Sequence, residues 1–144
     1  MGCDIHTFVE RYDGSEWELV NDAVFEDPYY SLDQPLTTYN TPFTNQLWTR
    51  RDYSLFELLA GVRGDLDKAL KPPAGIPGDA SRGWREYCDD WGDGLHSHTW
   101  YSLEELESAA RHLPYEFNKA VSAIRSRVAW YEDAKVRVVM AFDN

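Results

Sequence analysis

Hydrophobic and polar residues alternate near both ends of the chain, which predicts β-strands there. In residues 3–12, apolar or small side chains fall on one strand face, whereas Asp4 and His6 fall on the other. The next four residues, DGSE, predict a hairpin turn into a second strand, WELVN. The last ten residues, KVRVVMAFDN, predict a β-branched strand that is apolar enough to lie centrally, beside the first strand.

Between these strands the apolar spacing changes to that of helices. Residues 54–64, SLFELLAGVRG, predict a helix that begins with a capping box between Ser54 and Glu57. A glycine at Gly61 or Gly64 would end this helix.

Two further helices are predicted in the second half of the chain. Residues 102–113 carry the same capping pattern, from Ser102 to Glu105, and residues 114–132 begin with a proline at a position where helices tolerate it. Residues 81–91 could form a short additional helix. With strands at both ends and about three helices between them, the sequence predicts an α+β fold.

We therefore expect a single domain over residues 1–144, in which helices cover one face of a small antiparallel sheet formed by the N- and C-terminal strands. Long aromatic and Pro-rich loops would connect these elements. The longest, residues 21–49, has no clear period, and its aromatic residues make it a candidate for a ligand-lining loop.

Charge restricts the partners that the protein can bind. The chain has 14 Lys and Arg against 25 Asp and Glu, a net charge of −11. General electrostatics therefore disfavour duplex DNA and anionic membranes, and a phosphate-bearing ligand would need a local basic site. Neither a leader pattern nor an apolar run of about 20 residues is present, so we expect a cytoplasmic protein with no membrane partner. Homo-oligomer formation stays open.

Three of the four histidines lie in pairs with two-residue spacing, DIH and HSH. On extended chain such pairs point the same way. A site made of one carboxylate and three imidazoles would suit zinc, manganese or iron, or would act as a metal-free acid–base set. The candidate catalytic and metal-binding residues are Asp4, His6, His96 and His98.

We expect Asp4 and His6 to share one pocket with at least one of His96 and His98. The alternative is that pairs this short arise by chance, and that the histidines lie on the surface or are satisfied in the core.

A second candidate site is the basic pair Arg50 and Arg51, just before a predicted helix N-terminus. Guanidinium groups and free N–H groups bind phosphate, and Tyr53 or Trp100 could stack a base. The alternative is that these arginines pair with nearby acids. Cys3 is predicted to be a small buried hydrophobe.

Four blocks of the chain resemble, in the same order, a family of small phage and prophage proteins: MGCDIH, RRDYSLFELLAGVRG, HSHTW before a leucine-rich helix, and the ending FDN. The resemblance implies a viral protein in the cytoplasm of an infected bacterium. Small phage proteins of this sort include inhibitors of bacterial immunity that cleave or sequester nucleotide second messengers. The resemblance assigns no role to any residue.

Three hypotheses follow. The first is a phosphodiesterase that cleaves a cyclic nucleotide or oligonucleotide immune signal at the Asp/His site. The second is a non-catalytic sponge that sequesters the same nucleotide. The third is an acidic protein that inhibits a host defence enzyme by direct contact.

Overall fold

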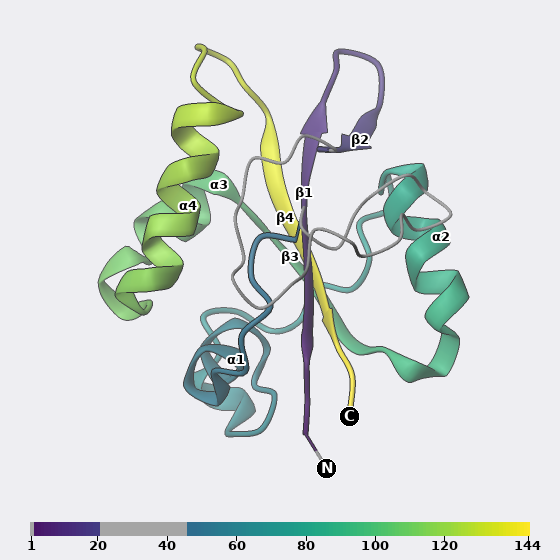
Figure 1. Ribbon diagram of the computed structural model, residues 1–144, viewed down its shortest axis with the longest axis vertical. Helices are drawn as coiled ribbons and strands as arrows, with labels where there is room; N and C mark the ends of the chain where they lie inside the picture. Colours follow the sequence, from purple (N-terminus) through teal and green to yellow (C-terminus); the bar gives the residue numbers. More distant parts are fainter. Residues whose placement is uncertain (1, 21–45) are drawn as a thin grey trace, which may run out of the picture.

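The computed structural model describes residues 2–20 and 46–144, which form an antiparallel four-stranded sheet flanked by helices (Figure 1). The strand order is β2-β1-β4-β3. The strands are β1 Ile5–Tyr12, β2 Trp17–Leu19, β3 His96–Ser102 and β4 Val136–Phe142. This confirms the α+β class, the N-terminal hairpin and the central position of the C-terminal strand beside β1.

Three strands meet at one end of the sheet. Ile5, where β1 begins, is opposite Phe142, where β4 ends, and Phe142 is also opposite His96, where β3 begins. Residues directly opposite each other in antiparallel strands point to the same face. Both chain ends lie at this end of the sheet (Figure 1).

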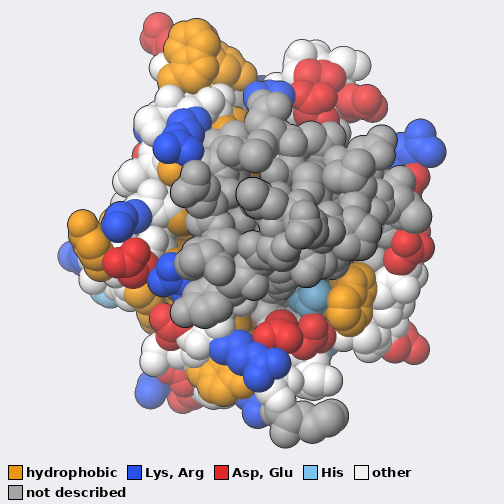
Figure 2. Space-filling model, in the orientation of Figure 1, with side chains coloured by type: hydrophobic (Ala, Val, Ile, Leu, Met, Phe, Trp, Pro, Cys, Tyr) orange, Lys and Arg blue, Asp and Glu red, His pale blue; other side chains and the backbone are white. Residues whose placement is uncertain are grey.

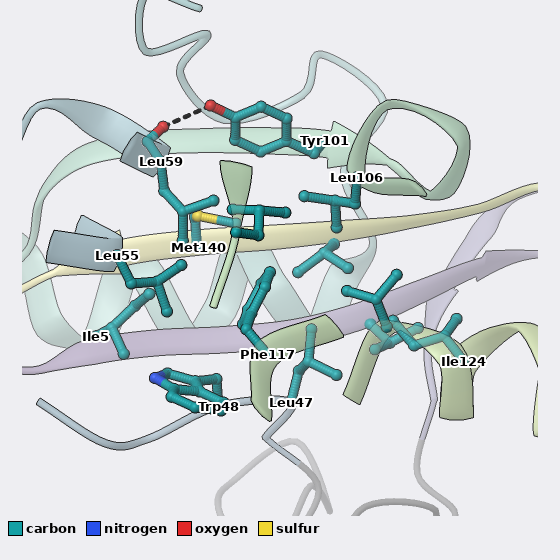
Figure 3. Close-up of a cluster of buried hydrophobic side chains, with 14 of the residues drawn as sticks. Ile5, Leu47, Trp48, Leu55, Leu59, Tyr101, Leu106, Phe117, Ile124 and Met140 are labelled. Carbon is teal, nitrogen blue, oxygen red and sulfur yellow. Dashed lines mark hydrogen bonds between the residues drawn. The ribbon is translucent and has the colours of Figure 1, made fainter. Parts of the chain in front are cut away.

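The larger core lies between the sheet and the three helices on one face, α1 Tyr53–Ala60, α3 Leu103–Ser108 and α4 Tyr115–Arg127 (Figure 1). Figure 3 shows how the side chains from these helices meet those of the strands. Tyr101 of β3 is buried there and donates a hydrogen bond of 2.6 Å to the Leu59 carbonyl, so its polar atom is satisfied.

The second face is covered by α2, Arg82–Trp91, so the expectation that helices cover only one face was wrong. A smaller cluster joins Trp84, Tyr87 and Cys88 of α2 to Phe8 of β1 and Val139 of β4. The reason is that β4 is apolar at every position except Arg137 and is buried on both faces. A strand of that kind needs cover on each side.

A buried ion pair supports this second face. Arg137 donates to Glu10 across 2.6 Å, and both side chains are almost fully buried. The guanidinium also donates to Asp79 and lies 3.8 Å from the centre of the Trp17 ring. The remaining Glu10 oxygen accepts from the Ser81 backbone, just before α2.

The start of α1 differs from the prediction. Asp52, not Ser54, is the N-cap, and its carboxylate accepts from the Leu55 backbone. Glu57 instead accepts from the backbone of Asp65, beyond the helix. Asp52, two residues earlier, already caps the first turn of the helix, so the Ser54–Glu57 box does not form.

The capping box between Ser102 and Glu105 is present at the start of α3, as predicted. Three short 3-10 helices complete the described elements: η2 Leu66–Lys68, η3 Gly92–Gly94 and η4 Ala110–His112. Among the described residues, no helix is both long and apolar enough to span a membrane.

Candidate functional site at one end of the sheet

His6 lies under α2 with both ring nitrogens engaged. Its Nδ1 is 2.6 Å from the Tyr87 hydroxyl, and its Nε2 is 2.7 Å from Asp143. The Trp91 ring packs against the imidazole with centroids 4.7 Å apart. The imidazole is therefore fixed between a phenol and a carboxylate, in a buried hydrogen-bond chain that joins α2 to the end of the sheet.

The Asp4 carboxylate pairs with Arg51 rather than with His6, although the Asp4 N–H donates to Asp143, the partner of His6. Asp4 precedes β1, and its carboxylate forms two hydrogen bonds with Arg51, the shorter being 2.6 Å. This guanidinium lowers the pKa of Asp4. The expectation that Asp4 and His6 share a strand face fails because strand alternation begins only at Ile5. Acidic and basic side chains lie next to each other at this end of the molecule (Figure 2).

Arg50 and Arg51 line a pocket of about 640 Å³ together with three carboxylates, from Asp4, Asp52 and Glu116. The carboxylates outnumber the guanidinium groups, and Arg51 is already bidentate to Asp4. This arrangement matches the alternative in which the arginines pair with acids. It gives little support for a phosphate site there.

The two aromatic candidates lie elsewhere. Tyr53, whose hydroxyl accepts from the Cys3 backbone, is partly exposed at the start of α1. Trp100 packs against the second-face cluster, with the Lys71 ammonium 4.8 Å from its ring centre. Cys3 is buried, as predicted, and burial raises the pKa of its thiol. Residues 21–45 of the predicted ligand-lining loop are outside the described part of the chain.

His96 occupies the opposite face of the sheet from His6. It lines a pocket of about 570 Å³ whose walls come from the end of α1, the η2 turn, the start of β3 and the chain end. We call this the sheet-end pocket; its lining residues are Ala60, Gly61, Val62, Arg63, Leu66, Pro73, His96, Ser97 and Asn144.

A β-bulge shapes the β3 side of the pocket. The pairing with β4 shifts between His96 and Thr99, and Ser97 has a φ of 55°. The extra residue of a bulge breaks strand alternation, so His96 and His98 do not form the same-face pair that the HSH pattern predicts. The loop between η2 and α2 runs beside the bulge, and its Gly75 N–H donates to the His98 carbonyl.

The α1 side of the pocket is shaped by a tight helix end. Gly61 has a φ of 70° and donates its N–H to the Glu57 carbonyl, so a left-handed glycine ends the helix. A Cβ on Gly61 would lie 2.6 Å from the Leu66 backbone, so only glycine fits. The turn places Arg63 at the pocket with a φ of 59° and its guanidinium 5.3 Å from the centre of the Tyr53 ring.

The two histidines of the HSH stretch differ in their surroundings, and of the two His96 is the one that lines the sheet-end pocket. His96 Nδ1 is 2.9 Å from the Ser97 hydroxyl, whereas His96 Nε2 is buried without a hydrogen-bond partner in the described structure. Because His96 Nε2 is buried, a ligand would contact it only after the imidazole rotates. Such a rotation is favoured because a buried nitrogen without a hydrogen bond costs free energy. Burial, and then the nearby His96, lower the pKa of His98.

His6 and His96 lie on opposite faces of the sheet, and Asp4 pairs with Arg51. A pocket that Asp4 and His6 share with His98 stays a prediction. Across residues 2–20 and 46–144, no three His, Cys, Asp or Glu side chains lie where they could hold a metal ion together. A zinc, manganese or iron cofactor stays a prediction as well.

Sequence reasoning missed Arg63, Ser97 and Tyr87 as site residues. Arg63 lies in the quoted block LAGVRG, directly after the helix-ending glycine, and this position was its available signal. Ser97 is the middle residue of HSH. Asp143, the partner of His6, follows the last strand, and this position was its available signal in the sequence.

No known protein-family model, curated protein or solved structure matches the chain.

Proposed function

We propose that the protein binds a small phosphate-bearing nucleotide in the sheet-end pocket and holds it without cleaving it. The supporting observation is backbone strain. Of the three non-glycine residues with positive φ in the described segments, Arg63 and Ser97 both line this pocket. Such strain costs about 1–3 kcal/mol per residue and concentrates at ligand sites. Here it brings a guanidinium and a hydroxyl together, and both donate hydrogen bonds to phosphate oxygens.

Three features support a nucleotide as the ligand: the volume of the pocket, its partly apolar wall and the resemblance of the sequence to phage proteins. A volume of about 570 Å³ lies within the usual range of small-molecule sites, and part of the wall is apolar. The resemblance to phage proteins favours a nucleotide second messenger of the infected bacterium as the ligand, bound in the cytoplasm.

Cleavage by a phosphodiesterase is the second candidate function, and one observation favours it. The lowered pKa of His98 favours the neutral imidazole, which can accept a proton from water, but His98 is not among the residues that line the sheet-end pocket. Hydrolysis also needs a group that protonates the leaving oxygen. His6, the candidate for that role, faces α2 on the other side of the sheet. Sequestration therefore fits the described geometry better than cleavage.

The binding proposal is tested by equilibrium dialysis of the protein with 3′,5′-cyclic AMP and AMP. We expect binding by the wild type and its loss in Arg63→Gln. The matched control is Arg82→Gln, which removes one positive charge from a side chain that is 91% exposed on α2. Unchanged affinity in Arg63→Gln, or no binding of either nucleotide by the wild type, would refute the proposal.

The fate of the nucleotide separates the two functions. After incubation, the protein is heat-denatured and the released nucleotide is analysed by chromatography. Intact cyclic AMP is expected from sequestration. Recovery of linear AMP instead would establish cleavage and overturn the sponge proposal.

A further inference from the structure

Resting on the proposed function, we infer that the sheet-end pocket selects a ligand with one negative phosphate charge. A phosphodiester, as in a 3′,5′-cyclic mononucleotide, would be preferred over nucleoside di- and triphosphates.

The inference starts from the charges that line the pocket. Arg63 is the one charged side chain among the described lining residues. A guanidinium keeps its positive charge whatever it contacts, so it can compensate one phosphate charge. The other polar lining side chains, Ser97, Asn144 and His96, can add hydrogen bonds, but the hydroxyl and the amide add no charge.

The charges beside the pocket oppose further phosphates. Leu66 lines the pocket, and its neighbours Asp65 and Asp67 are exposed on the η2 turn. Lys68 offsets one of these two acids, which leaves a net charge of −1 on this turn. The whole chain carries −11. A second or third phosphate beside Arg63 would add negative charge close to Asp65 and Asp67, where like charges repel.

The lining also argues for a phosphate ester with an organic body. Val62, Leu66 and Pro73 form an apolar part of the wall beside the polar groups. Specific small-molecule sites combine such an apolar wall with a few polar anchors. A sugar and base would cover the apolar wall, whereas inorganic phosphate would leave it in contact with water.

The test compares the dissociation constants of adenosine, cyclic AMP, AMP, ADP and ATP at low ionic strength without divalent cations. All share the same base, so the series varies the phosphate charge. We expect cyclic AMP to bind most tightly and affinity to fall about fivefold with each added charge. Adenosine should bind more weakly than cyclic AMP, because it offers nothing to Arg63. Raising the salt concentration should narrow the gap between cyclic AMP and ATP, since salt screens repulsion.

Two substitutions locate the effect. Asp67→Asn should raise ATP affinity about twofold or more and leave cyclic AMP affinity nearly unchanged. Asp89→Asn removes an exposed acid from α2, away from the pocket, and should alter neither. Arg63→Gln should reduce cyclic AMP to the affinity of adenosine.

The outcomes separate this inference from the proposed function. ATP binding as tightly as cyclic AMP, with both lost in Arg63→Gln, would overturn the single-charge inference and leave nucleotide binding intact. Adenosine binding as tightly as cyclic AMP, or no binding across the series, would overturn both. If affinity falls along the series in Arg63→Gln as it does in the wild type, the selection arises outside this pocket. That result would contradict both the single-charge inference and the proposed function.

Discussion

His6 and His96 lie at the same end of the sheet but on opposite faces, and their ring nitrogens have different surroundings. Both nitrogens of His6 have short contacts, to Tyr87 and Asp143, beneath α2. His96 has one contact, to the adjacent Ser97, and one buried nitrogen without a partner among the described residues. The first histidine has no hydrogen-bonding capacity left for a ligand, whereas the second has.

The surroundings of the two histidines differ in the same way. On the α2 face, His6, Glu10 and Arg137 are paired, the Trp84 indole nitrogen is buried without a partner among the described residues, and the backbone at His6 is ordinary strand. At the sheet-end pocket, Arg63 and Ser97 hold strained backbone conformations. Paired buried charges contribute to stability, and strained backbone around an open pocket is suited to binding. This comparison predicts which substitutions affect stability and which affect binding.

The largest effect should come from the ion pair on the α2 face. Glu10→Gln leaves the buried Arg137 with only Asp79 as an acidic partner, so we expect a loss of about 4 kcal/mol in the free energy of unfolding. Urea denaturation measures this loss. The control, Glu18→Gln, disrupts the half-exposed pair with Arg11 and should cost less than about 1 kcal/mol. Equal effects of the two substitutions would contradict a structural role for the buried pair.

The comparison itself is tested by making the same substitution at each histidine. His6→Leu removes the histidine contacts of the Tyr87 hydroxyl and of one Asp143 carboxylate oxygen, which should cost about 2 kcal/mol in unfolding free energy. His96→Leu removes an unpaired nitrogen and should change stability by less than about 1 kcal/mol. Nucleotide binding should show the reverse pattern, with loss in His96→Leu and retention in folded His6→Leu. Binding loss in both, or in neither, would remove the functional distinction between the two faces.

The sequence predicted those features that repeat over several residues. Alternation located β1, the apolar character of residues 136–142 gave β4 its central position, and the Ser102 capping pattern marked the start of α3. Each of these signals reflects burial or hydrogen bonding along a whole element.

The site depended on single residues, for which sequence has little signal. One positive φ at Ser97 breaks the alternation of HSH, and the one-residue offset of Asp4 from β1 turns its carboxylate to Arg51. The side of the sheet that α2 covers depends on the packing of Trp84 and Tyr87 against Phe8 and Val139, far apart in sequence. Periodicity therefore located the elements, but tertiary contacts determined which side chains meet.

Strain at the pocket gives a smaller and opposite prediction for stability. At Ser97, glycine should be more stable than alanine by about 1 kcal/mol, because alanine is strained at a φ of 55°. At Ser122, exposed in the interior of α4, the order should reverse, because glycine destabilises an ordinary helix position. Thermal and urea unfolding of the four variants measure both differences. Alanine more stable than glycine at both positions would show that Ser97 is not strained.

The smallest expected effect is on the pH dependence of stability, through His98. Burial and the neighbouring His96 lower its folded pKa below the ordinary value of 6.5, so between these two values the unfolded chain binds more protons than the folded one. Stability therefore rises with pH across this window; on acidification, its loss begins near pH 6.5 and continues down to the folded pKa. His98→Gln should make the decline between pH 7.5 and 5.5 less steep in urea denaturation. If His98→Gln and the wild type lose stability at the same rate, His98 is not held neutral by its place in the bulge, and the phosphodiesterase candidate loses the one observation that favours it.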